Sequence, residues 1–289
     1  FGFKSRGLGD VYKRQGMDTV AVQHYFKSRG KKRVADIVFA TTWHGRSFDL
    51  GKMTLSQLVK AYFTYYAIQV YLALAVISIA AAVMIPSGWV APLLAGATIV
   101  VLYPVVWYLL HRFVLHGEYL YRWKHTAAIW KRIHFDHHQD PHRLEVLFGA
   151  LYTTLPTIFV VSVPIGWAIA GPAGACAALA AGLLTTCVYE FVHCIQHLNF
   201  KPNNRWLKHM KEHHLLHHFH HEKGNYGITN FAVDRALGTY YDRAIERPRS
   251  PSVFNLGYDV EMAKKYPWVA EETGHMPRER PPSASRQEA

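Results

Sequence analysis

Two long stretches of this sequence contain no charged side chain, and they limit the possible folds more than any other feature. Residues 61–110 and residues 147–189 have no Asp, Glu, Lys or Arg, although the 289-residue chain contains 32 Lys and Arg and 20 Asp and Glu. A soluble domain distributes charge along its helices, whereas a helix that crosses a bilayer needs roughly 20 consecutive apolar residues. The sequence therefore predicts an integral membrane protein.

Each uncharged stretch divides into two helices of spanning length. The turn-forming residues "PSG" at 86–88 interrupt the first stretch, and "GPAG" at 171–174 interrupts the second. We therefore expect an all-α fold with four transmembrane helices and a helical cap on one side of the membrane. The expected spans are residues 61–85, 89–110, 147–170 and 175–197.

The positive charge indicates how these spans are oriented. Twelve Lys and Arg precede residue 61, six lie in residues 112–146 and 14 lie in residues 198–289, which accounts for all 32, and the two short turns carry none. The positive-inside rule then places both termini and the middle segment in the cytoplasm, at the inner membrane of a bacterium or the endoplasmic reticulum of a eukaryote. The net charge of +12 suits an anionic membrane surface or an acidic protein partner. No nucleic-acid-binding motif accompanies it, so we expect no nucleic-acid partner.

The remaining segments flank a domain at residues 61–242. Residues 1–16 fit none of the later patterns, and we treat them as a non-native leader before Met17. Residues 17–60 are expected to be a cytoplasmic N-terminal segment. Residues 243–289 form a tail whose Pro-, Ser- and charge-rich end predicts partial disorder.

Histidines gather in four clusters, each at the cytoplasmic end of a span or just beyond it. Two clusters follow spans directly, as "HRFVLH" and "EFVHCIQH", and two have the spacing HxxHH, as "HFDHH" and "HLLHH". The ten clustered residues are His111, His116, His134, His137, His138, His193, His197, His214, His217 and His218. All four clusters share one membrane depth, which predicts that they converge.

The spacing within the clusters suits metal binding. Residues at i, i+3 and i+4 share a helix face, as in both HxxHH motifs, and His193 and His197 are one turn apart. His111 and His116 lie about 140° apart on an ideal helix, so they require either a distorted helix or two different metal ions. Neutral imidazole is a ligand for iron, zinc and copper. Ten such ligands are too many for one ion and suit two.

The other histidines and the cysteines receive different interpretations. His24, His44 and His275 are expected at the surface, and His125 and His142 at the membrane interface. His209, His213, His220 and His221 are either further site residues or part of a hydrated basic face. The three cysteines form no CxxC pair, which gives no support for a disulfide framework or a thiolate metal site.

The order of these motifs resembles the fatty acid hydroxylase / sterol desaturase superfamily. The similarity continues through "NYGITN" at residues 225–230 and "VDRALGTYY" at residues 233–241, and "YEFVHCIQH" and "QDPHRLE" look most like the fatty acid 2-hydroxylase branch. The chain departs from that branch in two ways, because it shows no haem motif of a fused cytochrome b5 and no proline pair after "RL" in "RLEVLFGA". These departures concern the substrate more than the metal site.

The resemblance implies an O2-dependent lipid hydroxylase with two iron ions held by the ten histidines, and zinc is an alternative occupant in a recombinant sample. It implies a lipid substrate, a membrane location and an external electron donor such as ferredoxin or cytochrome b5, since no Rossmann, flavin or iron–sulfur motif is present. A desaturase or a sterol or carotenoid hydroxylase would use the same ligands and remains an alternative. A metal transporter would place ionisable residues near mid-membrane, and a zinc protease would need HExxH; neither pattern occurs.

Three carboxylates lie near the clusters. Glu190 is the predicted catalytic-site carboxylate, because a carboxylate beside an apolar span is costly without a partner. Asp136 and Asp140 are interpreted either as acceptors that orient imidazole N–H groups or as ordinary surface charges.

Overall fold

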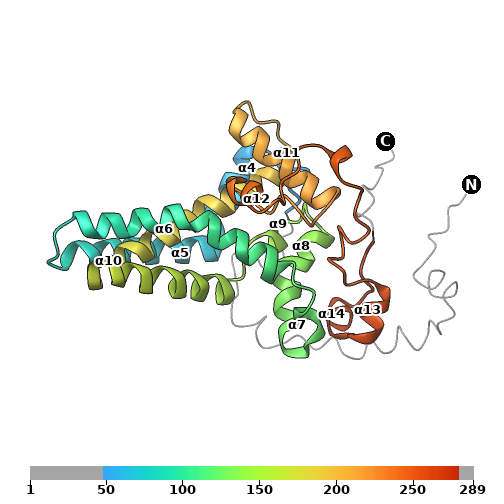
Figure 1. The fold of residues 1–289 in the computed structure, drawn as a ribbon, viewed down its shortest axis with the longest axis horizontal. Coiled ribbons are helices and arrows are strands. Elements are labelled where there is room, and N and C mark those ends of the chain that lie inside the picture. Colours follow the sequence, from blue (N-terminus) through green and yellow to red (C-terminus); the bar gives the residue numbers. More distant parts are fainter. Residues whose placement is uncertain (1–47, 280–289) are drawn as a thin grey trace, which may run out of the picture.

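The structure, a computed structural model, describes residues 48–279. Among these residues it contains helices and turns but no strand, apart from one isolated β-bridge between Asp49 and Arg143. Figure 1 shows an elongated bundle of α5 (Tyr66–Met84), α6 (Val90–Leu109) and α10 (Leu151–His197), with the shorter helices gathered at one end. The all-α prediction is confirmed for the described residues. The predictions for residues 1–16 and 17–47 lie outside them.

The first apolar run forms two helices, so the single span expected at residues 61–85 is wrong in its first part. Helix α4 (Leu55–Thr64) begins with a capping box in which Thr54 and Gln57 accept hydrogen bonds from each other's backbone N–H groups. The helix stops at Tyr65, whose backbone is extended, and α5 begins at the next residue. The Tyr65 ring stacks on Phe148 with a centroid distance of 4.2 Å. This packing accounts for a break inside a uniformly apolar sequence.

The second uncharged stretch folds back on itself within α10. Ala170 and Gly171 have non-helical backbone angles, and Gly171 adopts φ 58° and ψ −145°, a region open essentially to glycine alone. The predicted "GPAG" turn is therefore present, and the chain reverses direction at Gly171, the first of its four residues. Beyond it, Gly174 returns to pack against Gly166, and Gly182 packs against Ser162. The two arms of α10 thus lie antiparallel at close range.

Three helical segments are long and apolar enough to cross a membrane. They are Tyr66–Met84, Val90–Leu115 and Leu144–His197. The first two are separated by the predicted turn, where Gly88 takes φ +67°. The third contains both arms of α10, which correspond to the spans expected at residues 147–170 and 175–197. Only a minority of the residues in the most apolar part of each segment are buried, and exposed apolar residues such as Val83, Val101 and Val160 suit a lipid environment.

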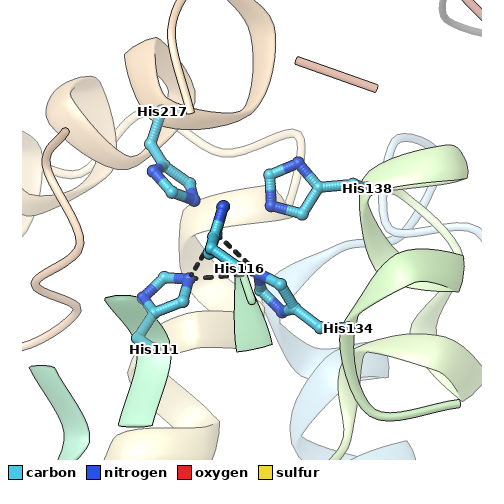
Figure 2. A group of neighbouring side chains, drawn as sticks. All are labelled: His111, His116, His134, His138 and His217. Atoms are coloured by element: carbon cyan, nitrogen blue, oxygen red, sulfur yellow. Dashed lines mark hydrogen bonds between the residues drawn. The ribbon is translucent and has the colours of Figure 1, made fainter. Parts of the chain in front are cut away.

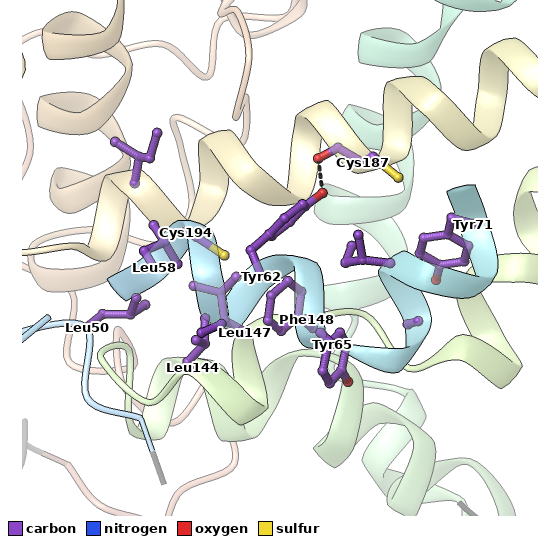
Figure 3. Close-up of a cluster of buried hydrophobic side chains, with 14 of the residues drawn as sticks. Leu50, Leu58, Tyr62, Tyr65, Tyr71, Leu144, Leu147, Phe148, Cys187 and Cys194 are labelled. Atoms are coloured by element: carbon purple, nitrogen blue, oxygen red, sulfur yellow. Dashed lines mark hydrogen bonds between the residues drawn. The ribbon is translucent and has the colours of Figure 1, made fainter. Parts of the chain in front are cut away.

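An aromatic and aliphatic core joins the bundle to the shorter helices (Figure 3). Tyr62 of α4 donates its hydroxyl hydrogen bond to the carbonyl oxygen of Cys187 in α10, at 2.5 Å. Leu50, Leu58 and Phe148 are buried beside this contact. The core therefore fixes α4 against the end of α10 that carries the histidines.

The shorter helices form a cap around the histidine-bearing ends of α6 and α10. They include two π-helices, η1 (Leu110–Leu115) and η3 (Lys131–Phe135). The remaining elements are η2 (Leu120–Arg122), α7 (Lys124–Trp130), α8 (Asp136–Gln139), α9 (Leu144–Leu147), α11 (Arg205–Phe219), α12 (Ala232–Ala236), η4 (Ala244–Glu246), α13 (Val260–Lys265) and α14 (Trp268–Thr273). Much of the tail predicted as partly disordered is folded, because residues 243–279 include three of these helices and bury Tyr258 and Val269 completely.

The close packing of the two arms of α10 can be tested with Gly166→Val. A Cβ at residue 166 would overlap the Gly174 carbonyl oxygen and the Ala178 side chain. Overpacking of this kind costs about 1–3 kcal/mol, so we expect a lower midpoint of thermal unfolding in detergent micelles. Ala168→Val, on the exposed side of the same arm, is the matched control and should leave the midpoint unchanged. Equal midpoints for the two variants would contradict the packed hairpin.

Candidate metal centre

The ten clustered histidines converge into two groups of five. Within each group the candidate ligand nitrogens all lie within 4.8 Å of one another. Group A, shown in Figure 2, contains His111, His116, His134, His138 and His217. Group B contains His137, His193, His197, His214 and His218. The other histidines join neither group among the described residues.

The two HxxHH motifs are divided between the groups in a reciprocal way. In "HFDHH", His134 and His138 enter group A while His137 enters group B. In "HLLHH" the first and last histidines enter group B, and His217 enters group A. Residues i and i+4 differ by about 40° around a helix, whereas i+3 and i+4 differ by about 100°. Each motif therefore lies between the two groups and supplies two imidazoles to one and a single imidazole to the other.

A π-helix resolves the orientation of His111 and His116. His111 is the second residue of η1, and His116 directly follows its last residue. The backbone N–H of His116 donates to the carbonyl oxygen of His111 at 3.0 Å, which is an i→i+5 hydrogen bond. This wider turn brings both imidazoles into group A. Of the two alternatives, the structure adopts the distorted helix, which places both imidazoles in one group.

Backbone carbonyls fix the ring orientation of three group A histidines. The Nδ1 atoms of His111, His217 and His138 lie 2.6, 2.7 and 2.8 Å from the carbonyl oxygens of Tyr226, Gly224 and Val253, respectively. A carbonyl oxygen only accepts, so each Nδ1 carries the hydrogen and donates it. Each Nε2 then has a free lone pair. Sequence reasoning missed these acceptors; Tyr226 lies in the family-like "NYGITN" segment, and no sequence signal pointed to Val253.

The inward nitrogens crowd one another in both groups. In group A the Nε2 atoms of His111, His116 and His134 are 2.9 to 3.2 Å apart, as drawn in Figure 2. In group B the Nε2 atoms of His137 and His193 are 3.1 Å apart, and those of His197 and His214 are 2.8 Å apart. Lone pairs at such distances repel unless a proton or a cation lies between them.

Several nitrogens of the grouped histidines have no hydrogen-bond partner among the described residues. They include Nε2 of His138, Nε2 of His217 and both nitrogens of His218, and all three residues are fully buried. Buried polar atoms of folded proteins rarely lack a hydrogen-bond partner, and a bound ion is one accepted explanation where they do. A buried all-nitrogen donor set of this kind fits a divalent transition-metal ion such as iron or zinc in each group.

Burial keeps the cap histidines neutral. Removal from solvent, together with the neighbouring imidazoles, holds the pKa well below the ordinary value of 6.5 for the residues His116, His134, His137, His214, His217 and His218. Burial likewise lowers the pKa of His138 to about 3. Neutral imidazole is the form that binds metal, so these residues can bind a metal ion near neutral pH without first losing a proton.

The three carboxylates singled out in the sequence do not orient the imidazoles. Glu190 is buried, and its Oε1 accepts from the backbone N–H of Gly149 at 3.2 Å. Asp136 forms an ion pair with Lys131 at 2.7 Å. Within residues 48–279 no hydrogen bond joins Glu190, Asp136 or Asp140 to a histidine, and the carbonyls described above act as acceptors instead.

Histidines outside the two groups have ordinary partners. His213 contacts Asp242 and Tyr240 through Nε2, both at 2.9 Å, and the carbonyl oxygen of His209 through Nδ1 at 2.8 Å. His213, His209 and Asp242 thus form a third cluster with metal-ligand chemistry, but the His213 nitrogens are already satisfied within it. His220 contacts the carbonyl oxygen of Arg247. His213, which is buried, and His220 are therefore parts of hydrogen-bonded structure outside the two groups.

Comparison with known proteins agrees with this geometry. Residues 96–239 match the family model described as fatty acid hydroxylase. A dihydroceramide fatty acyl 2-hydroxylase of Arabidopsis thaliana, FAH2, is 33% identical over 137 residues, which cover 46% of this chain and 54% of the relative. The ceramide very long chain fatty acid hydroxylase SCS7 of Saccharomyces cerevisiae is 28% identical over 148 residues, which cover 49% of this chain and 36% of the relative. This chain thus spans about half the length of the plant relative.

A solved structure shares the fold. The structure described as full-length scs7p, in which only the hydroxylase domain is visible, superposes with a TM-score of 0.52 at 23% identity. The superposition covers 64% of this chain and 68% of the other. All ten grouped histidines lie inside the matched residues 96–239, and the chain therefore carries a fatty acid hydroxylase domain that places it in that family.

Proposed function

We propose that this chain is a membrane-bound oxygenase that holds one iron ion in each histidine group and hydroxylates the acyl chain of a lipid. The observation that carries the proposal is the pair of almost entirely buried five-imidazole groups, in each of which the candidate ligand nitrogens all lie within 4.8 Å of one another. The names of the matched relatives, fatty acyl and ceramide fatty acid hydroxylases, support the class of substrate. In outline, R–H, O2, two electrons and two protons give R–OH and water.

Iron bound in these groups would supply the oxidant, because no protein side chain can oxidise an unactivated C–H bond. The protein's own residues would hold the ions, exclude water and orient the substrate. Zinc fits the same imidazoles and would compete for them in a recombinant sample. The two electrons would come from an external donor, and the strongly basic chain suits an acidic one such as ferredoxin or cytochrome b5.

A pocket lies between α6 and α10, in the part of the bundle that an acyl chain would contact. It is small and partly open, so it would mark where the acyl chain packs against the helices and would not enclose it. It is lined by Ile99, Leu102, Tyr103, Val106, Trp107, Thr157, Ile158, Val161, Ser162 and Gly182. The polar groups at its wall are engaged elsewhere, since Tyr103 donates to Thr186 at 3.0 Å and Thr157 donates to the carbonyl oxygen of Thr153 at 2.8 Å. The wall is therefore effectively apolar.

Aromatic rings connect this pocket to group B. Trp107 lines the pocket and stacks on Tyr189 with a centroid distance of 5.0 Å. The Tyr189 ring lies 6.3 Å from that of His193. A lipid whose tail packs against the pocket and whose headgroup lies at the cap would present its early methylenes to the metal groups. Positioning would then select the carbon next to the carboxyl end.

Glu190 enters the proposal as a positioning residue. It lies one helical turn before His193, and its contact with the N–H of Gly149 ties the second arm of α10 to the chain just before the first arm. A buried carboxylate in this place holds the cap end of the hairpin together. Through that contact it keeps His193 and His197 in register with the cap.

The metal assignment predicts about two ions per chain. His217→Ala should remove an ion from group A and His137→Ala an ion from group B, because each variant deletes one imidazole of the respective set. We expect about one ion per chain for each variant by metal analysis after iron loading, and loss of hydroxylation by at least about 100-fold. His275→Ala, whose Nδ1 contacts the carbonyl oxygen of Met276, is the control. One ion or none in the wild type would refute the two-ion proposal.

The product distinguishes hydroxylation from the alternatives within the family. Expression should add one oxygen atom to acyl chains, at the carbon next to the carboxyl group, as seen by mass spectrometry of total lipids. Loss of two hydrogens without added oxygen would indicate a desaturase instead. An oxidised sterol or carotenoid with unchanged acyl chains would indicate a different substrate.

The proposed orientation has four spans with both ends of the chain in the cytoplasm. A reporter at Ser87, in the turn between α5 and α6, should read as non-cytoplasmic, and a reporter fused at Ala289 should read as cytoplasmic. A cytoplasmic signal at Ser87 would contradict the four-span topology. It would also contradict the cytoplasmic location of the cap.

A further inference from the structure

The segment at residues 250–278 lies beyond the family-matched residues, yet it contacts the elements that supply group A. At its start, the N–H of Ser250 donates to the carbonyl oxygen of His220 at 2.9 Å, and Ser252 donates to Glu222 at 2.6 Å. These contacts join it to the end of α11, which carries His217. We call residues 250–278 the strap.

Three residues after Ser250, the strap contacts His138 through Val253. The carbonyl oxygen of Val253 accepts from Nδ1 of His138 at 2.8 Å, which directs the lone pair of Nε2 into group A. His138 is fully buried, and its Nε2 has no other partner among the described residues. The strap therefore supplies the contact that sets the tautomer of one group A imidazole.

Gln139, the neighbour of His138, holds both ends of the strap. Its Nε2 donates to the carbonyl oxygens of Phe254 and Arg278, and its Oε1 accepts from the N–H of Arg278 at 2.8 Å. The Gln139 side chain is buried, so these hydrogen bonds do not compete with water. A single side chain on α8 thus fixes two points of the strap that are 24 residues apart in sequence.

An apolar anchor connects the strap to the third element of group A. Leu256, Tyr258 and Val269 pack in one buried cluster with Trp130. Trp130 donates its indole N–H to the carbonyl oxygen of Leu115 at 2.9 Å, at the residue before His116. The strap therefore braces the ends of α11, α8 and η1, the elements that position His217, His138 and His116.

Group B has no comparable support. The Nδ1 atoms of His137, His197, His214 and His218 have no hydrogen-bond partner within residues 48–279. We propose that the strap is a positioning device for group A alone, and that Gln139 is the positioning residue that seats it. The inference rests on the proposed two-ion site.

Chelator competition on the full-length protein in detergent, loaded with Zn²⁺ as the probe, tests this inference. Removing the contacts that orient a ligand typically weakens metal binding by roughly 10- to 100-fold. Gln139→Ala should therefore weaken one of two zinc ions by about that factor and leave the other unchanged. Gln139→Glu keeps the size and the acceptor for Arg278 but loses both donated hydrogen bonds, and it should show the same selective effect.

Three comparisons make the result decisive. In Gln139→Ala, residues 250–278 should also become more sensitive to limited proteolysis. His138→Ala should weaken the same ion, so adding Gln139→Ala to it should cause no further loss. Glu261→Ala, whose side chain is 74% exposed on the strap, should retain both ions like the wild type.

The outcomes separate this inference from the proposed function. If both Gln139 variants hold two zinc ions as tightly as the wild type does, the role of the strap is overturned and the two-ion site remains intact. Equal weakening of both ions would also overturn it, because the strap would then support the cap as a whole. Fewer than two ions in the wild type would refute the proposed function itself, and the strap inference with it.

Discussion

The cap depends on bringing neutral imidazole lone pairs together in a space without water. Ten histidines converge with nitrogen–nitrogen distances as short as 2.8 Å, and burial holds the pKa of cap histidines such as His214 well below its ordinary value. Without a cation this arrangement is repulsive, and buried unpaired nitrogens add a desolvation penalty of about 1–3 kcal/mol each. The other contacts of the cap must therefore stabilise an arrangement of imidazoles that is unfavourable without metal. Two bound ions would make the same arrangement favourable.

Two π-helices, η1 and η3, help to position the imidazoles, and each interrupts the regular α-helical backbone. The π-helix η1 turns His116 toward His111, and a second π-helix, η3, precedes His137 and His138. π-Helices are rare and concentrate at functional sites, because a wider turn is less stable than an α-helical one. Here the wider turn directs the imidazoles of His111 and His116 into one group. In an ideal α-helix, side chains five residues apart would point about 140° away from each other.

The sequence predicted features that follow from local pattern and missed those that follow from tertiary contact. Uncharged stretches, the two turns and the histidine spacing indicated the helices and all ten grouped residues, because composition and period are local properties. The break at Tyr65 arises from stacking on Phe148, and the tautomer of His138 from the carbonyl of Val253, 115 residues away. The helices within residues 243–279 were not predicted for the same reason. The buried Tyr258 and Val269 of this segment become part of a core only through contact with the cluster around Trp130.

The reciprocal division of the HxxHH motifs has a mechanical consequence. Since α8 and α11 each supply both groups, a shift of either whole helix would move histidines of both, whereas a change in the orientation of one ring, such as that of His138, affects one group alone. The two groups differ, however, in what lies behind them. Group A is backed by carbonyls of the cap, at Gly224, Tyr226 and Val253, whereas group B adjoins the aromatic pair of Trp107 and Tyr189 at the end of the apolar pocket. Under the proposed function, an acyl chain would therefore approach the centre from the side of the membrane helices.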